Sequence, residues 1–170
     1  MRVTHHEAWA LVHGMLLGGG LLLGFSGGIL ALYGLRSELL TADGVRDRIL
    51  QLKVGTSLMA LMGWATVITG TWIILPWYRD SSPTSPKSVL LADPATERWH
   101  TFADVWKTHL AWTAPMLATA AAFLVIYYGR SLARDTTARR VVLALFLGAF
   151  AISSIAALIG SLVTRAAPIH

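Results

Sequence analysis

Two histidines in apolar surroundings are the side chains of this sequence best suited to chemistry. His13 lies in LVHGMLLGGG, where every neighbour is apolar or glycine, and His109 lies in KTHLAW, where another apolar stretch begins. An ionisable side chain within a membrane segment is costly, so such a residue is a functional candidate by default. A neutral imidazole can ligate a metal ion or exchange a proton. The simpler alternatives are an interhelical hydrogen bond for His13 and hydration at the membrane boundary for His109.

Four stretches without Asp, Glu, Lys or Arg supply the elements that would position these histidines. They cover about residues 8–35, 54–78, 108–129 and 141–164. Each reaches the roughly 20 residues that a helix needs to cross the hydrocarbon core of a bilayer. Backbone groups find no water in lipid, so helices satisfy them where open sheets cannot. The sequence therefore predicts an all-α fold, a four-helix transmembrane bundle that forms a single domain over residues 1–170.

Composition supports a membrane protein and excludes several kinds of site. The chain is 55% hydrophobic and 14% charged, with a mean hydropathy of +0.58. It has no cysteine, which excludes disulfides, thiolate metal sites, iron–sulfur clusters and thioether-linked haem. The net charge of +5 comes from short segments between apolar runs, so we interpret it as a topology signal and expect no nucleic-acid partner.

The two histidines are expected at one depth in the bundle. Spans one and three would cross in the same direction, and His13 and His109 both lie near the N-terminal ends of their spans. Two imidazoles at one level suit axial coordination of a b-type haem held between helices. We expect one haem b near the outer face, with His13 and His109 as iron ligands and His100 as the alternative to His109.

Glycines continue the helix face that carries His13. Gly20, Gly24 and Gly28 recur at four-residue spacing in the first span, and Gly70 lies near the outer end of the second. Glycine removes side chains that would obstruct a flat macrocycle or a close neighbouring helix. We expect Gly20, Gly24 and Gly70 to border the haem, although helix packing alone explains the stripe in the first span equally well.

Basic residues indicate the orientation of the bundle. The two short loops carry eight Lys and Arg residues, whereas the opposite side, with both termini and the long 79–107 loop, carries six. Because cytoplasmic loops are enriched in these residues, we expect both termini to be periplasmic in a bacterial inner membrane. Lys107 and Arg79 would then lie at the outer boundary, where they can neutralise haem propionates.

The long 79–107 connection ends in the amphipathic segment ERWHTFADVWK. Trp99, Phe102, Val105 and Trp106 recur there at helical spacing, which predicts a short interfacial helix lying at the membrane surface before span three. Six of the seven tryptophans fall on this outer side. That distribution is typical of an aromatic belt, with a protein or cofactor contact surface as the alternative.

Several short elements together resemble small four-helix bacterial membrane proteins of the b-type cytochrome kind. They are LVHG in span one, ITGTWIILPWYR closing span two, KTHLAW opening span three and LIGSLV in span four. They extend over nearly the whole chain, and none is a stringent motif. The resemblance implies haem b binding and electron transfer, with His13 and His109 as the matching ligands. Better-known di-haem members place more histidines within their helices.

The expected function is that of a non-catalytic electron-transfer subunit of an oxidoreductase complex. Its partners would be the lipid bilayer, other membrane-complex subunits, and quinone or a periplasmic electron carrier. A cofactor-free structural subunit of a respiratory or photosynthetic complex would show the same hydropathy and glycine pattern. Transport is weaker because the spans contain no buried acid and no inverted repeat. The sequence has no P-loop, dinucleotide-binding or HExxH motif.

Overall fold

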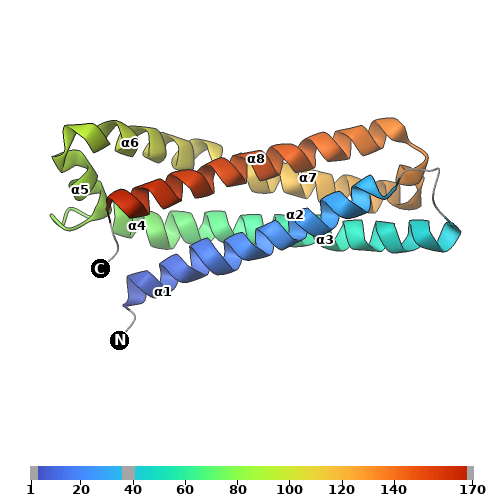
Figure 1. Ribbon diagram of the computed structural model, residues 1–170, viewed down its shortest axis with the longest axis horizontal. Coiled ribbons are helices and arrows are strands. Elements are labelled where there is room, and N and C mark those ends of the chain that lie inside the picture. The colour runs from blue at the N-terminus through green and yellow to red at the C-terminus, as the bar shows by residue number, and fades with distance from the viewer. Residues whose placement is uncertain (1–3, 36–40, 168–170) are drawn as a thin grey trace.

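Four long helices make up most of the protein. The computed structural model describes residues 4–35 and 41–167. Within these residues, four helices are long and apolar enough to cross a membrane, and we number them as spans one to four: His5–Tyr33, Ala42–Tyr78, Pro94–Ala133 and Thr136–Ala166. They run lengthwise in an elongated bundle, with both chain ends at the same end (Figure 1). The predicted all-α fold with four membrane-length helices is confirmed.

Three of the four spans change helix type along their length. Span one is made of α1 (His5–Leu11), the π-helical segment η1 (Val12–Leu17) and α2 (Gly18–Tyr33). Span two is made of α3 (Ala42–Thr69), the π-helical segment η3 (Gly70–Ile74) and α4 (Leu75–Tyr78). Span three is made of α6 (Pro94–Val105), the π-helical segment η4 (Trp106–Leu110), α7 (Thr113–Tyr128) and the 3₁₀ turn η5 (Gly129–Ala133). Span four is the single helix α8 (Thr136–Ala166).

Three of the long helices begin before their charge-free stretches, at residues whose side chains cap the first turn. Thr4 and Glu7 form a capping box at α1, in which the Thr4 amide donates to the Glu7 carboxylate at 2.7 Å. The Thr41 hydroxyl accepts from the amide of Gly44, and the Asp135 carboxylate accepts from the amide of Ala138. Because these caps lie in the polar flanks, the helices are longer than the apolar runs that they contain.

A short helix does lie between spans two and three, but at a different place in the loop. It is α5 (Pro86–Ala92), capped by Ser85. The segment ERWHTFADVWK belongs instead to α6 and η4 and continues into span three. The predicted short helix between the two spans is therefore confirmed, and ERWHTFADVWK is helical as its spacing predicted, but this segment forms the start of span three. No proline or glycine interrupts residues 95–114, so nothing in the backbone ends the helix there.

Spans one and two are held together by close contact between glycines. A Cβ atom added to Gly55 would lie 2.6 Å from the backbone nitrogen of Gly28, and one added to Gly24 would lie 2.8 Å from the backbone nitrogen of Met59. The fully buried ring of Phe146 in span four covers Gly28 from the other side. Small residues of this kind let helix backbones approach closely in lipid.

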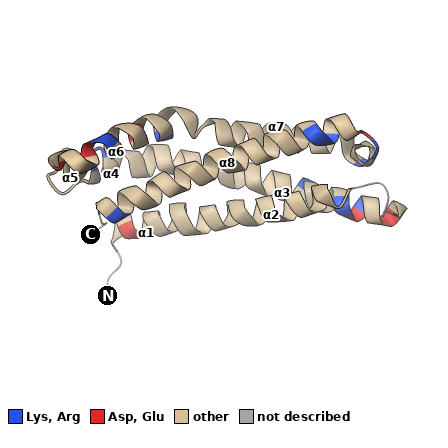
Figure 2. Ribbon diagram, turned by 45° about the horizontal axis from the view of Figure 1, so that its top comes forward, with Lys and Arg blue, Asp and Glu red and all other residues tan. Residues whose placement is uncertain are grey.

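Charged residues gather at the two ends of the bundle. Figure 2 shows the Lys, Arg, Asp and Glu positions at both ends and a middle without them, as expected for helices that cross a bilayer. Arg2 and Arg36, which count toward the expected orientation, lie outside the described residues. The periplasmic placement of the termini stays a prediction.

Candidate functional site

A large cavity lies among the four spans at the end that carries both termini. Its volume is about 1140 Å³, and its lining is mostly apolar. All four spans line it: span one with His13, span two with Gly70, span three with Lys107 and span four with Gly160. The volume is at or above the roughly 300–1,000 Å³ of ordinary small-molecule sites, so the cavity has room for a large amphipathic molecule.

The three π-helical segments of the described residues all contribute to this cavity. His13 lies in η1, Gly70 in η3 and Lys107 in η4, and each of them lines the wall. A π turn is rare and occurs frequently at functional sites, where it changes the direction of the side chains that follow. Three of the spans therefore change from α-helix to π-helix where they line the cavity.

The half-buried imidazole of His13 is held by span two. Its Nδ1 lies 2.9 Å from Oγ1 of Thr69, which also lies 2.8 Å from the carbonyl oxygen of Ala65 and 3.2 Å from that of Thr66. When the Thr69 hydroxyl donates to one of these carbonyl oxygens, Nδ1 of His13 is the donor to Thr69 and Nε2 keeps its lone pair. Metal-ligating histidines usually show this arrangement, in which one ring nitrogen donates and the other stays free to bind.

Gly70 makes room for the His13 ring itself. A Cβ atom on Gly70 would lie 3.0 Å from Cε1 of His13. Any larger residue would press on the imidazole and displace it from Thr69. Gly70 thus lines the cavity, as expected, and also sets the position of His13.

Lys107 brings a positive charge into the apolar cavity. Its Nζ lies beside Gly160, where a Cβ atom would be only 3.0 Å away. Within the described residues, Lys107 makes no hydrogen bond or ion pair. An unpaired ammonium in apolar surroundings is costly, so an anionic group bound in the cavity would offset that cost.

His109 does not join His13 in the cavity. It is exposed, its Nδ1 lies 3.1 Å from the carbonyl oxygen of Val105 in the preceding turn, and it is absent from the cavity wall. Side chains two positions apart on a helix point to nearly opposite sides. Because Lys107 faces the cavity, His109 faces away from it.

Two of the glycines expected near a cofactor are occupied by helix packing. The side chain of Met62 fills the space beside Gly20, with Sδ 2.8 Å from a Cβ added there, and Gly24 packs on the backbone of Met59. Neither glycine lines the cavity, whereas Gly18 and Gly19 do.

Arg79 and His100 are engaged in contacts between the end of span two and the start of span three. The Arg79 guanidinium binds the Asp104 carboxylate, with Nη2 2.7 Å from Oδ1 and 2.8 Å from Oδ2. Nδ1 of His100 lies 2.6 Å from the hydroxyl of Tyr78. Asp104 and Tyr78 line the cavity, but Arg79 and His100 do not. Arg79 and His100 therefore contact residues that line the cavity without lining it themselves.

Sequence reasoning missed Thr69 and did not connect Gly160 with Lys107. Thr69 precedes Gly70 at the outer end of span two, at the depth expected for His13, so matched depth was the signal that could have found it. Gly160 lies in LIGSLV, and nothing in the sequence pairs it with Lys107.

Among residues 4–35 and 41–167, no group of three or more His, Cys, Asp and Glu residues is placed to hold a metal ion. Comparison with protein-family models, with curated proteins and with solved structures finds no match to this chain.

Proposed function

We propose that this small four-span membrane protein is an electron-transfer subunit that binds one haem b in the outer cavity. His13 would supply an axial ligand to the iron through Nε2. The observation that carries the proposal is the hydrogen bond between His13 Nδ1 and Thr69 Oγ1, because it orients the imidazole of a residue that lines a large, mostly apolar cavity and engages only one of its two nitrogens.

A porphyrin supplies four nitrogen ligands of its own, so one protein imidazole is enough to hold the iron. The proposal therefore keeps His13 and leaves out His109, which faces away from the cavity. Lys107 takes the role of neutralising a propionate, because its ammonium lies in the same cavity without a partner in the described residues. Arg79 is already neutralised by Asp104.

The tautomer of His13 separates haem from a quinone as the cavity ligand. An iron atom is a Lewis acid and needs the lone pair of Nε2, whereas a quinone oxygen accepts hydrogen bonds and needs Nε2 as a donor. The arrangement that suits haem forms when Nδ1 donates to Thr69 and the Thr69 hydroxyl donates to Ala65. A bound haem would exchange electrons, and the chain would provide its ligand, its charge partner and a mostly apolar lining. Other membrane subunits, together with quinone or a periplasmic carrier, would be the electron donor and acceptor at the bacterial inner membrane.

An absorption spectrum of the purified full chain tests this proposal. We expect a Soret band and, after reduction, an α-band. His13→Ala should abolish both bands, and His109→Ala should leave them in place as the matched control. Protein without a Soret band after expression with added haem, or a His13→Ala variant with an unchanged spectrum, would overturn the proposal.

The close contact of Gly24 and Gly28 with span two favours one other function. A cofactor-free structural subunit needs tightly packed helices and no ligand in the cavity. It predicts a folded protein without visible absorbance, incorporated into a larger membrane complex.

A further inference from the structure

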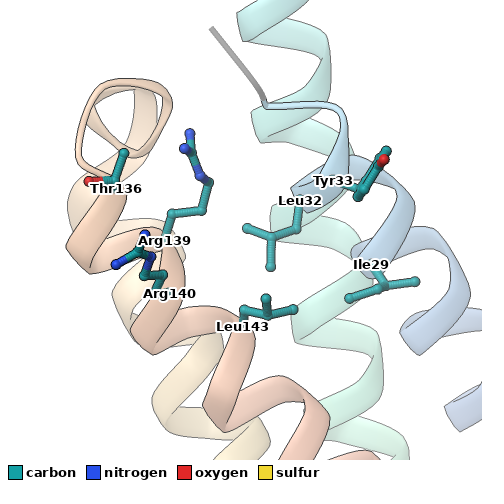
Figure 3. Close-up of a pocket in the computed structure, with 7 residues that line it drawn as sticks. All are labelled: Ile29, Leu32, Tyr33, Thr136, Arg139, Arg140 and Leu143. Atoms are coloured by element: carbon teal, nitrogen blue, oxygen red, sulfur yellow. The ribbon is translucent and has the colours of Figure 1, made fainter.

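A second, smaller pocket lies at the opposite end of the bundle, between the end of α2 and the start of α8. Its volume is about 240 Å³. Its lining residues are Ile29, Leu32 and Tyr33 on α2 and Thr136, Arg139, Arg140 and Leu143 on α8. Figure 3 shows Leu32 and Leu143 pointing toward each other between the two helices. The pocket is separate from the haem site of the proposed function and does not depend on it.

The two arginines of this pocket differ in their hydrogen bonds to the protein. Nη1 of Arg139 donates to the carbonyl oxygen of Leu35 at 3.0 Å and to that of Ala133 at 3.2 Å. These bonds fix its guanidinium and leave further N–H donors for a ligand. Arg140 is exposed and makes no hydrogen bond or ion pair with the described residues.

The positive charge of the pocket is not balanced by a carboxylate of the described residues. The nearest acid along the chain, Asp135, accepts from the amide of Ala138 and forms no ion pair with either arginine. An anion would therefore complete the pocket. Arg binds phosphate with two parallel hydrogen bonds, which makes phosphate a better match than a halide or a single carboxylate oxygen.

The pocket is also graded from polar to apolar along the bundle axis. On α8, Thr136 is at the helix start and Leu143 lies two turns closer to the bundle centre; on α2, Tyr33 is the last residue and Ile29 lies one turn inward. The polar groups thus lie at the membrane boundary and the apolar ones toward the hydrocarbon. This is the polarity of a phospholipid, with its headgroup outside its acyl chains.

We propose that this pocket binds the headgroup of an acidic phospholipid. The phosphate lies between Arg139 and Arg140, and an acyl chain follows Ile29, Leu32 and Leu143 toward the membrane centre. Basic pockets between transmembrane helices on the cytoplasmic side bind acidic lipid headgroups in this way. The lysine and arginine excess of the short loops predicts that this end of the bundle lies on that side.

Native mass spectrometry of the full chain in detergent with added lipid tests the proposal. The wild type should retain phosphatidylglycerol in preference to phosphatidylcholine. Arg140→Gln should lower the apparent affinity for phosphatidylglycerol roughly five-fold, the worth of one basic residue near an anionic lipid. Arg134→Gln is the matched control, since Arg134 is an exposed arginine of the same end that does not line the pocket.

Inorganic phosphate in large excess separates a lipid site from a free-anion site. If the apolar wall contributes, phosphate should leave the bound phosphatidylglycerol in place. Displacement by phosphate, equal retention of the two lipids, or equal losses in Arg140→Gln and Arg134→Gln would each overturn the proposal. Arg140 makes no contact that the fold needs, so its substitution should leave the helices intact.

Discussion

Nδ1 of His13 and Oγ1 of Thr69 lie 2.9 Å apart, and this contact joins span one to span two at the wall of the large cavity. The hydroxyl directs its proton to its own helix, at the carbonyl oxygen of Ala65. In that arrangement His13 is the donor through Nδ1. The contact engages Nδ1 and leaves Nε2 as the nitrogen that can bind a ligand.

Replacing Thr69 by valine should weaken haem binding while keeping His13 in place. Valine has nearly the shape of threonine but cannot accept from Nδ1, so the ring loses its fixed tautomer and orientation. Loss of such a partner typically lowers metal affinity by about 10–100-fold. A haem titration followed by the Soret band measures this, and Thr69→Ser should restore most of the affinity. Unchanged affinity in Thr69→Val would show that the contact serves only helix packing.

Replacing Lys107 by methionine should affect the empty and the loaded protein in opposite directions. Without ligand, the substitution removes an unpaired charge from an apolar cavity, so the free energy of unfolding should stay the same or rise. With haem, it removes a charge-assisted hydrogen bond to a propionate, worth about 1.5–3 kcal/mol. Thermal unfolding and haem titration check the two effects, with Lys87→Met, outside the cavity, as the control. A loss of stability in the empty protein would instead assign Lys107 a structural role.

Replacing Gly55 by alanine should destabilise the bundle whatever the cavity binds. The new Cβ would lie 2.6 Å from the backbone nitrogen of Gly28, and backbone cannot move aside as a flexible side chain can. Overpacking of this kind costs typically about 1–3 kcal/mol. Gly27→Ala is the control, because no heavy atom lies within 4 Å of its added Cβ. Unfolding in a denaturing detergent measures both variants, and equal stability would mean that spans one and two are not packed as described.

The fold was predictable because the charge-free stretches are long enough to cross a bilayer and backbone in lipid must be helical. The helix ends were less predictable, since caps such as Thr41 and Asp135 lie among polar residues that hydropathy treats as loop. The predicted and observed helix starts differ most in span three. Its charged N-terminal part, from Pro94 to Lys107, is continuous helix although its composition resembles a surface segment.

The candidate site was predictable only where the sequence neighbours of a single residue were enough to identify it. His13 was identified by its apolar neighbours alone, and it lines the cavity. The side of span three on which His109 lies depends on the π-helical geometry of η4. No sequence signal marks that π-helical segment. For Gly24, the sequence left cofactor and packing open, and its partner Met59 could be identified only from coordinates.

The ion pair between Arg79 and Asp104 should stabilise the outer end of the bundle modestly. The side chains are 42% and 26% exposed, so water and salt weaken their attraction. A double-mutant cycle with Arg79→Gln and Asp104→Asn should give a coupling energy of up to about 1 kcal/mol. The coupling should fall further at high ionic strength. A value that does not change with salt would indicate that the pair acts through packing rather than charge.

The orientation of the bundle can be tested directly because the chain has no cysteine. Ser81 and Thr137 are exposed residues at opposite ends, so Ser81→Cys and Thr137→Cys each add one reactive thiol at a known end. If the excess of Lys and Arg keeps the short loops in the cytoplasm, a membrane-impermeant maleimide should label Ser81→Cys in intact cells. It should label Thr137→Cys only after the cells are permeabilised. The reverse pattern would place the large cavity on the cytoplasmic side and the pair Arg139 and Arg140 outside, where fewer acidic headgroups would be expected.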